Sequence, residues 1–243
     1  MHPVICSIGP FTIYSYGLLM AIAFLTVSAL AVQQARRSGL NPDAVFNLSF
    51  IAFISGVIGA RILYVAENMP YYLENPLEIF MFQRGGLSWF GGLITGAICG
   101  IIYLRKKRLP VYGTLDLIAP FVALGQAIGR VGCLLNGCCF GKPSGFGIYF
   151  KTHHSVLIPT QIYSSLFLVI IFIILRRTQD KPHREGMIFS LYLVLYSAQR
   201  FFIEFWRADN EVIFFGLTLF QLISIAVFFF AGWKISSIKR SGK

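Results

Sequence analysis

The chain has 243 residues, of which 56% are hydrophobic and only 13% are charged, and its mean hydropathy is +0.69. This composition is too apolar for a soluble domain of that length and indicates an integral membrane protein. In a soluble protein, the net charge of +11 would suggest a nucleic-acid partner. Here we expect none, because the cations gather between apolar stretches.

Seven mostly apolar stretches of about 20 residues, the length that crosses a bilayer, follow one another along the chain. Each is expected to be helical, because lipid offers no partner for a free backbone group. We therefore expect an all-α integral membrane protein, a single polytopic domain over residues 1–243, whose seven helices surround a polar, arginine-lined cavity. The expected spans are 13–32, 44–65, 86–104, 115–129, 160–175, 186–205 and 217–233.

Basic residues fall on alternate connections, at 36–37, 105–108, 176–184 and 234–243. Cytoplasmic loops of membrane proteins carry such an excess of Lys and Arg, so we expect the N-terminus outside and the C-terminus in the cytoplasm. The stretch 13–32 lacks a basic start and a small-residue cleavage site. It is therefore interpreted as a retained helix and not as an export signal.

Three arginines, Arg61, Arg130 and Arg200, lie inside or at the ends of the apolar stretches. An arginine at membrane depth costs several kcal/mol, so it usually faces a polar cavity and is matched to an anion. The expected anion is a phosphate.

The segment from 125 to 141 combines Arg130 and Asn136 with closely spaced glycines, among them Gly132, Gly137 and Gly141. Glycine permits positive-φ turns that point successive N–H groups at an anion. Small residues also let membrane helices pack closely, which is the alternative for the glycines alone. With Arg130 and Asn136 in the same run, a phosphate site is favoured.

A second polar group contains Arg200, Glu204 and Arg207. Steps of four and three residues place all three on one face of a continuous helix. Glu204 is then expected to neutralise one arginine, as a structural ion pair, while the other binds a ligand. Arg200 should lie deeper than Arg207 by about two turns, and Arg207 should reach water at the outer edge.

Cys133, Cys138 and Cys139 occur within seven residues. They are interpreted first as packing or loop-stapling residues, second as a redox pair and third as a metal site. The outer face of the membrane is oxidising, which would allow a disulfide. The Cys-x4-Cys-Cys spacing differs from common zinc motifs, and His153 and His154 are the nearest further ligands. We expect no metal and no cofactor.

Five motifs occur in a fixed order: Tyr-Gly-Leu at 16–18, Gly-Gly-Leu-Ser-Trp-Phe-Gly-Gly at 85–92, Gly-Arg-Val-Gly-Cys with Asn-Gly-x-x-x-Gly at 129–141, Pro-Thr-Gln-Ile-Tyr at 159–163 and Arg-x-x-x-Glu-x-x-Arg at 200–207. Together they resemble the signatures of the bacterial prolipoprotein diacylglyceryl transferases. The resemblance extends over nearly the whole chain. It departs from the family where Phe90, Cys133, Cys138 and Ile158 replace histidine, asparagine, glutamate and histidine.

The resemblance implies transfer of a diacylglyceryl group from phosphatidylglycerol to the lipobox cysteine of a prolipoprotein signal peptide, with release of glycerol phosphate. The partners are then both substrates and the lipid bilayer, and the location is the bacterial cytoplasmic (inner) membrane. Arg130 is assigned to the lipid headgroup and Arg200 to the leaving phosphate, because arginines in a water-poor site stabilise developing negative charge. Tyr16 lines or polarises the same cavity.

Further residues are expected to bind substrate around these three. Asn136 is assigned to the glycerol hydroxyls, while Gln161 and Tyr163 close the headgroup cavity. Gly132, Gly137, Gly141, Glu204 and Arg207 complete the expected substrate site. Two alternative functions stay open at this stage: a membrane thiol oxidoreductase that uses the cysteines, and a phospholipid-binding or transport protein that lacks chemistry.

Overall fold

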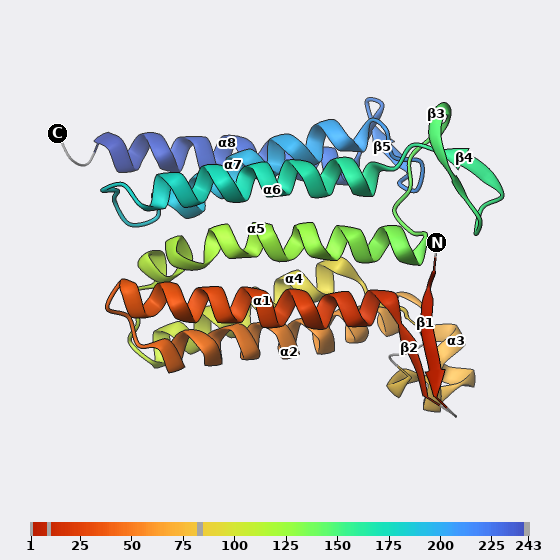
Figure 1. The fold of residues 1–243 in the computed structure, drawn as a ribbon, viewed down its shortest axis with the longest axis horizontal. Coiled ribbons are helices and arrows are strands. Elements are labelled where there is room, and N and C mark those ends of the chain that lie inside the picture. The colour runs from red at the N-terminus through yellow and green to blue at the C-terminus, as the bar shows by residue number, and fades with distance from the viewer. Residues whose placement is uncertain (1, 9–10, 82–84, 241–243) are drawn as a thin grey trace. The chain divides into compact units, whose positions relative to one another are not determined.

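The computed structural model describes residues 2–8, 11–81 and 85–240. The chain folds into two compact units. The first unit contains Met1–Val27 and Leu115–Lys243, and the second contains Ser28–Thr114. Figure 1 shows that long helices dominate the chain, with short hairpins and turns at their ends.

The second unit is built around helices α2 (Pro42–Glu67) and α4 (Trp89–Lys106), together with the C-terminal part of α1 (Ser15–Arg37). Helices α2 and α4 pack closely through small residues. A Cβ on Gly92 would lie 3.2 Å from the Gly56 carbonyl oxygen, and one on Gly96 would lie 3.0 Å from that of Ala52. Small side chains therefore let the two backbones approach, as in other membrane helix pairs. The connection contains α3 (Met69–Glu74) and η1 (Pro76–Phe80).

The first unit contains α5 (Val111–Asn136, from Leu115), α6 (Thr160–Gln179), α7 (Met187–Glu204) and α8 (Leu219–Arg240), with the start of α1. Its buried core joins α5, α6 and α7 through Ala119, Ala123, Ile171, Leu175, Ile188 and Tyr192. Asp116 accepts hydrogen bonds from the Gly186 and Phe189 amides at 2.6 and 2.7 Å. This carboxylate satisfies amides at the start of α7 that no carbonyl of that helix can reach.

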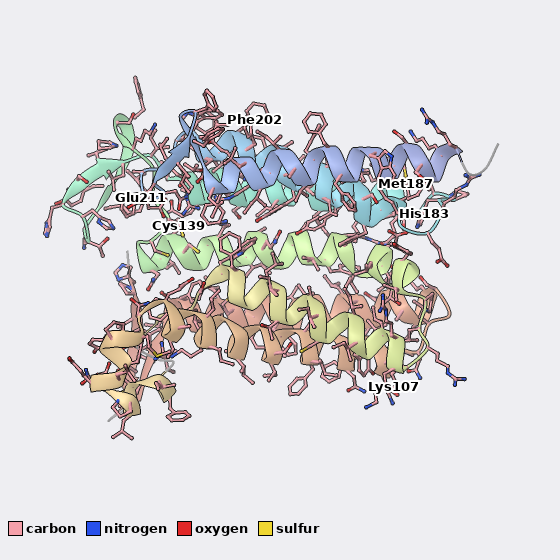
Figure 2. All side chains as sticks on the ribbon, turned by 180° about the vertical axis from the view of Figure 1, so that it is seen from behind. Lys107, Cys139, His183, Met187, Phe202 and Glu211 are labelled. Carbon is pink, nitrogen blue, oxygen red and sulfur yellow. The ribbon has the colours of Figure 1, made fainter. Side chains whose placement is uncertain are left out.

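Three two-stranded antiparallel hairpins belong to the first unit: β1 (Val4–Ile8) with β2 (Phe11–Tyr14), β3 (Pro143–Phe150) with β4 (Ser155–Leu157), and β5 (Val212–Phe214) with β6 (Leu217–Thr218). Figure 1 shows β3, β4 and β5 at the end of this unit where α5 finishes and α6 begins. In Figure 2, Cys139 and Glu211 lie at that same end, and His183 and Met187 lie at the opposite one.

Each of the seven predicted stretches contains a helix, so the all-helical prediction is confirmed. Among the described residues, five helices, α1, α2, α5, α6 and α8, are long and apolar enough to cross a membrane. Helices α4 and α7 have 18 residues each and carry charged side chains within that length. Seven crossings and the orientation of the termini therefore stay predictions.

Candidate active site

The last two turns of α5 carry Arg130, Cys133 and Asn136. The helix continues to Asn136, past residue 129, where the predicted span ends. Gly132 lies within this helix, and the chain first turns to a positive φ, of 77°, at Gly137. Steps of three residues keep Arg130, Cys133 and Asn136 on one side of α5.

Arg130 is half-buried, yet its guanidinium forms no hydrogen bond or ion pair with any residue that the structure describes. Its electrostatic neighbours are Cys133, Cys139, Tyr196 and Arg207. A guanidinium carries five donors in a planar fork that matches carboxylate or phosphate oxygens. Because no carboxylate of the described chain occupies that fork, Arg130 is available to an anionic ligand.

Arg200 and Glu204 form a buried ion pair in the last turn of α7, with 3.0 Å between Nη2 and Oε2. The Arg200 guanidinium also lies over the Phe220 ring, 4.5 Å from its centroid. Glu204 accepts further hydrogen bonds from Asn210 at 2.6 Å and from Thr218 at 2.9 Å. The carboxylate is therefore held in place, and the expectation that Glu204 pairs with an arginine is confirmed.

Arg207 does not share a helical face with Arg200, because α7 ends at Glu204. The residue pairs with Gly141 in an isolated β-bridge instead. Its side chain is only 8% exposed, so the expectation that it snorkels to water is wrong. It donates two hydrogen bonds to Asp209, at 2.8 and 2.6 Å, and lies 3.9 Å from the Glu204 carboxylate.

These contacts make the site electropositive. Arg200 and Arg207 both lie beside the Glu204 carboxylate, at 3.0 and 3.9 Å, and Arg130 interacts electrostatically with both. The ion pairs of these arginines involve two carboxylates, those of Glu204 and Asp209. An excess of buried positive charge favours binding of an anion.

The three glycines differ in what they do: some allow close packing of helices, and others turn the chain. Gly132 is helical, and a Cβ there would lie 3.3 Å from the Tyr16 ring, so it serves close packing of α1 against α5. Gly137 has a φ of 77° and ends the helix, and its carbonyl is bound by His153 Nε2 at 3.0 Å. Gly141 lies where a Cβ would come within 2.7 Å of both Ile158 and the Trp206 carbonyl oxygen.

The start of α6 holds the loop that follows α5. Gln161 Nε2 donates to the Cys138 carbonyl at 2.6 Å, and Thr160 Oγ1 donates to the Cys139 carbonyl at 2.7 Å. The Gln161 side chain is buried, and its Oε1 has no hydrogen-bond partner among the described residues. A buried acceptor without a partner costs about 1–3 kcal/mol, so a ligand or water that donates to this atom is favoured.

The thiols of Cys133, Cys138 and Cys139 converge, with all three sulfur atoms within 4.8 Å of one another. All are half-buried, and none is in a disulfide. Hydrogen bonds from the Cys133 and Cys138 thiols lower the pKa of Cys139 below its usual value. The charges of Arg207 and Arg130 lower it further, whereas burial opposes the shift.

Tyr16 lies in the first turn of α1 and interacts electrostatically with Arg130 and the three cysteines. The structure therefore brings it to the site as expected. Tyr163 differs, since its side chain is 39% exposed in the first turn of α6 and its phenol has no hydrogen bond among the described residues. Asn136 is exposed at the end of α5, beside the Cys138 thiol.

Arg61 belongs to the second unit and has another task. Its guanidinium donates to the backbone carbonyls of Glu78, Ile79, Gly85 and Gly86. Those bonds hold the connection between α2 and α4 against the end of α2. Arg61 is thus used by the chain itself, in contrast to Arg130.

The sequence did not single out Asp209, Asn210, Thr218 or Phe220, which hold Arg207, Glu204 and Arg200. One signal was present for Thr218, because Thr-x-x-Gln is a capping-box pattern. In the structure the Thr218 amide donates to Gln221 Oε1 at 3.0 Å, and the Gln221 amide donates to Thr218 Oγ1 at 3.4 Å. The contacts of Asp209 and Asn210 depend on the loop after α7 and leave no pattern.

Comparisons with known proteins agree with one another. The sequence model described as prolipoprotein diacylglyceryl transferase matches residues 3–236. The phosphatidylglycerol–prolipoprotein diacylglyceryl transferase of Clostridium tetani is 35% identical over 232 residues, 93% of each chain. The enzymes of the same name are 35% identical in Staphylococcus haemolyticus, over 93% of this chain and 84% of that one, and 31% identical in Lactiplantibacillus plantarum, over 94% and 86%.

Proposed function

We propose that this chain, which belongs to the prolipoprotein diacylglyceryl transferase family, transfers a diacylglyceryl group from phosphatidylglycerol to the lipobox cysteine of a prolipoprotein. The names of its relatives support both substrates. The reaction forms a thioether and releases glycerol phosphate. The signal peptide of the precursor supplies the nucleophile, so the reaction requires no nucleophilic cysteine of the enzyme.

The observation that carries this proposal is the guanidinium of Arg130, which has no hydrogen-bond or ion-pair partner among the described residues. It lies at the end of the first unit that also holds Arg200 and Arg207. A phosphodiester headgroup provides one negative charge and oxygens that accept two parallel N–H bonds. Membrane-depth arginines are costly when they lack an anion. Binding of the phosphatidylglycerol headgroup supplies the anion that the described chain does not.

Arg200 stabilises the leaving phosphate in this proposal. As the thiolate attacks the glycerol carbon, the carbon–oxygen bond breaks and its electron pair moves to the phosphate oxygen. Glu204 holds the Arg200 guanidinium at 3.0 Å and leaves other N–H groups of the fork free to donate. A donor that is already in place needs no reorganisation at the moment of reaction, which is how such groups lower a barrier.

The remaining residues bind or orient the lipid. Tyr16 and Asn136 contact the glycerol portion, and their position beside the cysteine cluster supports this role. Gln161 Oε1 is a buried acceptor for a hydroxyl. Gly132, Gly137 and Gly141 keep space and turn the chain, while Arg207 completes the positive surface. Tyr163, which is exposed, contacts the lipid from the rim.

The membrane arrangement is part of the proposal. Seven spans in a single polytopic domain place the N-terminus outside and the C-terminus in the cytoplasm of the bacterial inner membrane. In the first unit, Arg176, Arg177, Lys181, Arg184, Lys239 and Arg240 cluster at one set of helix ends, which supports a cytoplasmic location for those ends. Lys243 belongs to the same predicted cluster but lies outside the described residues.

The test uses purified protein in detergent with phosphatidylglycerol and a lipobox peptide. We expect glycerol phosphate release that depends on the peptide, together with a thioether-linked product seen by mass spectrometry. A peptide with serine in place of the lipobox cysteine is the matched control, and it should give no product. If release does not exceed that of a no-enzyme sample, the proposal fails and the non-catalytic lipid-binding alternative gains support.

A further inference from the structure

The cysteine cluster is a candidate metal site. Three sulfur atoms lie within 4.8 Å of one another, and they come from the end of α5 and from the loop directly after it. Zinc–sulfur bonds of about 2.3 Å place sulfurs about 3.8 Å apart around a tetrahedral ion. Contraction by about 1 Å would therefore bring the three thiols into that arrangement.

The backbone holds this geometry without a disulfide. The Cys138 amide donates to the Cys133 carbonyl at 3.1 Å, and Gln161 and Thr160 bind the carbonyls of Cys138 and Cys139. Cys139 adopts a positive φ of 64°, which is unfavourable for a residue with a side chain. The loop thus holds an unfavourable backbone conformation at one of the three converging cysteines.

The other two interpretations of the cysteines explain less. Simple packing does not require three sulfurs to converge beside charged guanidiniums, because cysteine behaves as a small apolar residue when its role is packing. A disulfide would join two of the sulfurs and leave the third alone. A metal uses all three, although the Cys-x4-Cys-Cys spacing had led us to expect none.

We propose that Cys133, Cys138 and Cys139 bind one Zn²⁺ as three thiolates, and that its fourth position takes the thiol of the lipobox cysteine. This inference rests on the proposed function, and it names how the incoming nucleophile is activated. His153 is not a ligand in this arrangement, because its ring packs against Phe140, with 4.0 Å between the ring centroids, and its Nε2 binds the Gly137 carbonyl.

The chemistry balances without an oxidant. The substrate thiol replaces a water on the ion and loses one proton to solvent, because coordination to Zn²⁺ deprotonates a thiol. The bound thiolate then forms the sulfur–carbon bond while the carbon–oxygen bond breaks and its electrons leave with glycerol phosphate. The product is a neutral thioether, a weaker ligand than thiolate, so water replaces it.

Charge in the site agrees with this arrangement. One Zn²⁺ with three thiolates carries a net charge of −1, and a bound substrate thiolate makes this charge −2. Arg130 and Arg207 both interact electrostatically with the Cys139 thiol, so they offset that charge. The chain also has Phe90 and Cys138 where the family it resembles has histidine and glutamate. A metal-bound thiolate removes the need for a side chain that accepts the thiol proton.

The first experiment measures metal binding separately from activity. Full-length protein with Cys6→Ser and Cys99→Ser, which removes both cysteines outside the cluster, is freed of metal under reducing conditions and titrated with Co²⁺. We expect one equivalent to bind with sulfur-to-cobalt charge-transfer absorption, and one equivalent of Zn²⁺ to displace it. Cys138→Ser on the same background should weaken binding at least about tenfold. Absence of the charge-transfer band overturns the zinc site.

The second experiment tests thiol activation. Adding the lipobox peptide to the Co²⁺ protein should shift the cobalt spectrum, whereas a peptide with serine in place of cysteine should not. Transfer should fall at least about tenfold after metal removal and should return with one equivalent of Zn²⁺. Wild-type transfer by metal-free protein overturns this inference and leaves the proposed function intact. Zinc binding and a peptide-dependent spectral shift without transfer in any state support the inference and overturn the proposed function. Zinc binding with neither the shift nor a dependence of transfer on zinc overturns thiol activation.

Discussion

Replacing Arg200 and Arg130 by lysine separates the two roles assigned to them. Lysine keeps the positive charge, so the ion pair that Arg200 forms with Glu204 at 3.0 Å is retained in kind. What it loses is the planar fork that donates to a second acceptor while still bound to Glu204. The Arg130→Lys variant loses the same fork, but Arg130 has no carboxylate partner among the described residues.

The expected magnitude follows from the number of hydrogen bonds lost. A hydrogen bond to a charged group contributes about 1.5–3 kcal/mol, and the retained charge of lysine recovers part of that. We therefore expect Arg200→Lys to remove about 1.4 kcal/mol of transition-state stabilisation, which lowers kcat about tenfold. Because the charge on the leaving phosphate grows as the bond breaks, the loss should appear in the chemical step.

Arg130→Lys should act differently, because headgroup binding is present in both the ground state and the transition state. A loss of uniform binding raises KM and leaves kcat nearly unchanged. We expect the KM for phosphatidylglycerol to rise several-fold while kcat stays within about twofold. The assay is glycerol phosphate release at varied phosphatidylglycerol in mixed micelles, with the lipobox peptide at saturation.

Arg177→Lys is the matched control, because it makes the same substitution at an exposed residue away from the site. All three variants should insert and fold, because lysine and arginine have similar membrane costs. If Arg200→Lys and Arg130→Lys both show the kinetics of the Arg177→Lys control, the arginines have no part in phosphate chemistry. If both variants change KM alone, the assignment of Arg200 to the leaving group is wrong.

Three further changes test the supports of the site and, at the opposite end of the first unit, the start of α7. Asp116→Ala leaves the buried Gly186 amide and the partly buried Phe189 amide at the start of α7 without an acceptor. The protein should therefore lose about 2–4 kcal/mol of stability, measured by unfolding in detergent against Asp116→Asn, which keeps one acceptor. Gly141→Ala should reduce folded yield and activity, because its Cβ would meet neighbouring atoms at 2.7 Å, whereas Gly145→Ala, with nothing within 4 Å, should be tolerated. Glu204→Gln keeps an acceptor for Thr218 but removes the countercharge of Arg200, so kcat should fall at least about tenfold while the protein still folds; unchanged kcat would show that positioning of Arg200 does not depend on this charge.

The sequence by itself determined where the long helices lie. Each apolar stretch became a helix because a long, mostly apolar run can satisfy its backbone only within itself, and this holds even for α5, which contains Asp116 and Pro120. Pairs separated by four residues in one helix were also predictable, and Arg200 with Glu204 is such a pair. Local spacing was enough in these cases, because the interacting groups belong to one element.

Only the tertiary structure decided which residues meet across elements. Arg207 is buried because the loop after α7 brings Asp209 to it, and Arg61 is satisfied by backbone carbonyls that lie 17 or more residues further along the chain. The three thiols converge because α5 continues to Asn136 and the start of α6 holds the following loop. Hydropathy reports the surroundings of each residue along the chain, whereas these contacts depend on the rotation of helices and the path of loops, which no local pattern records.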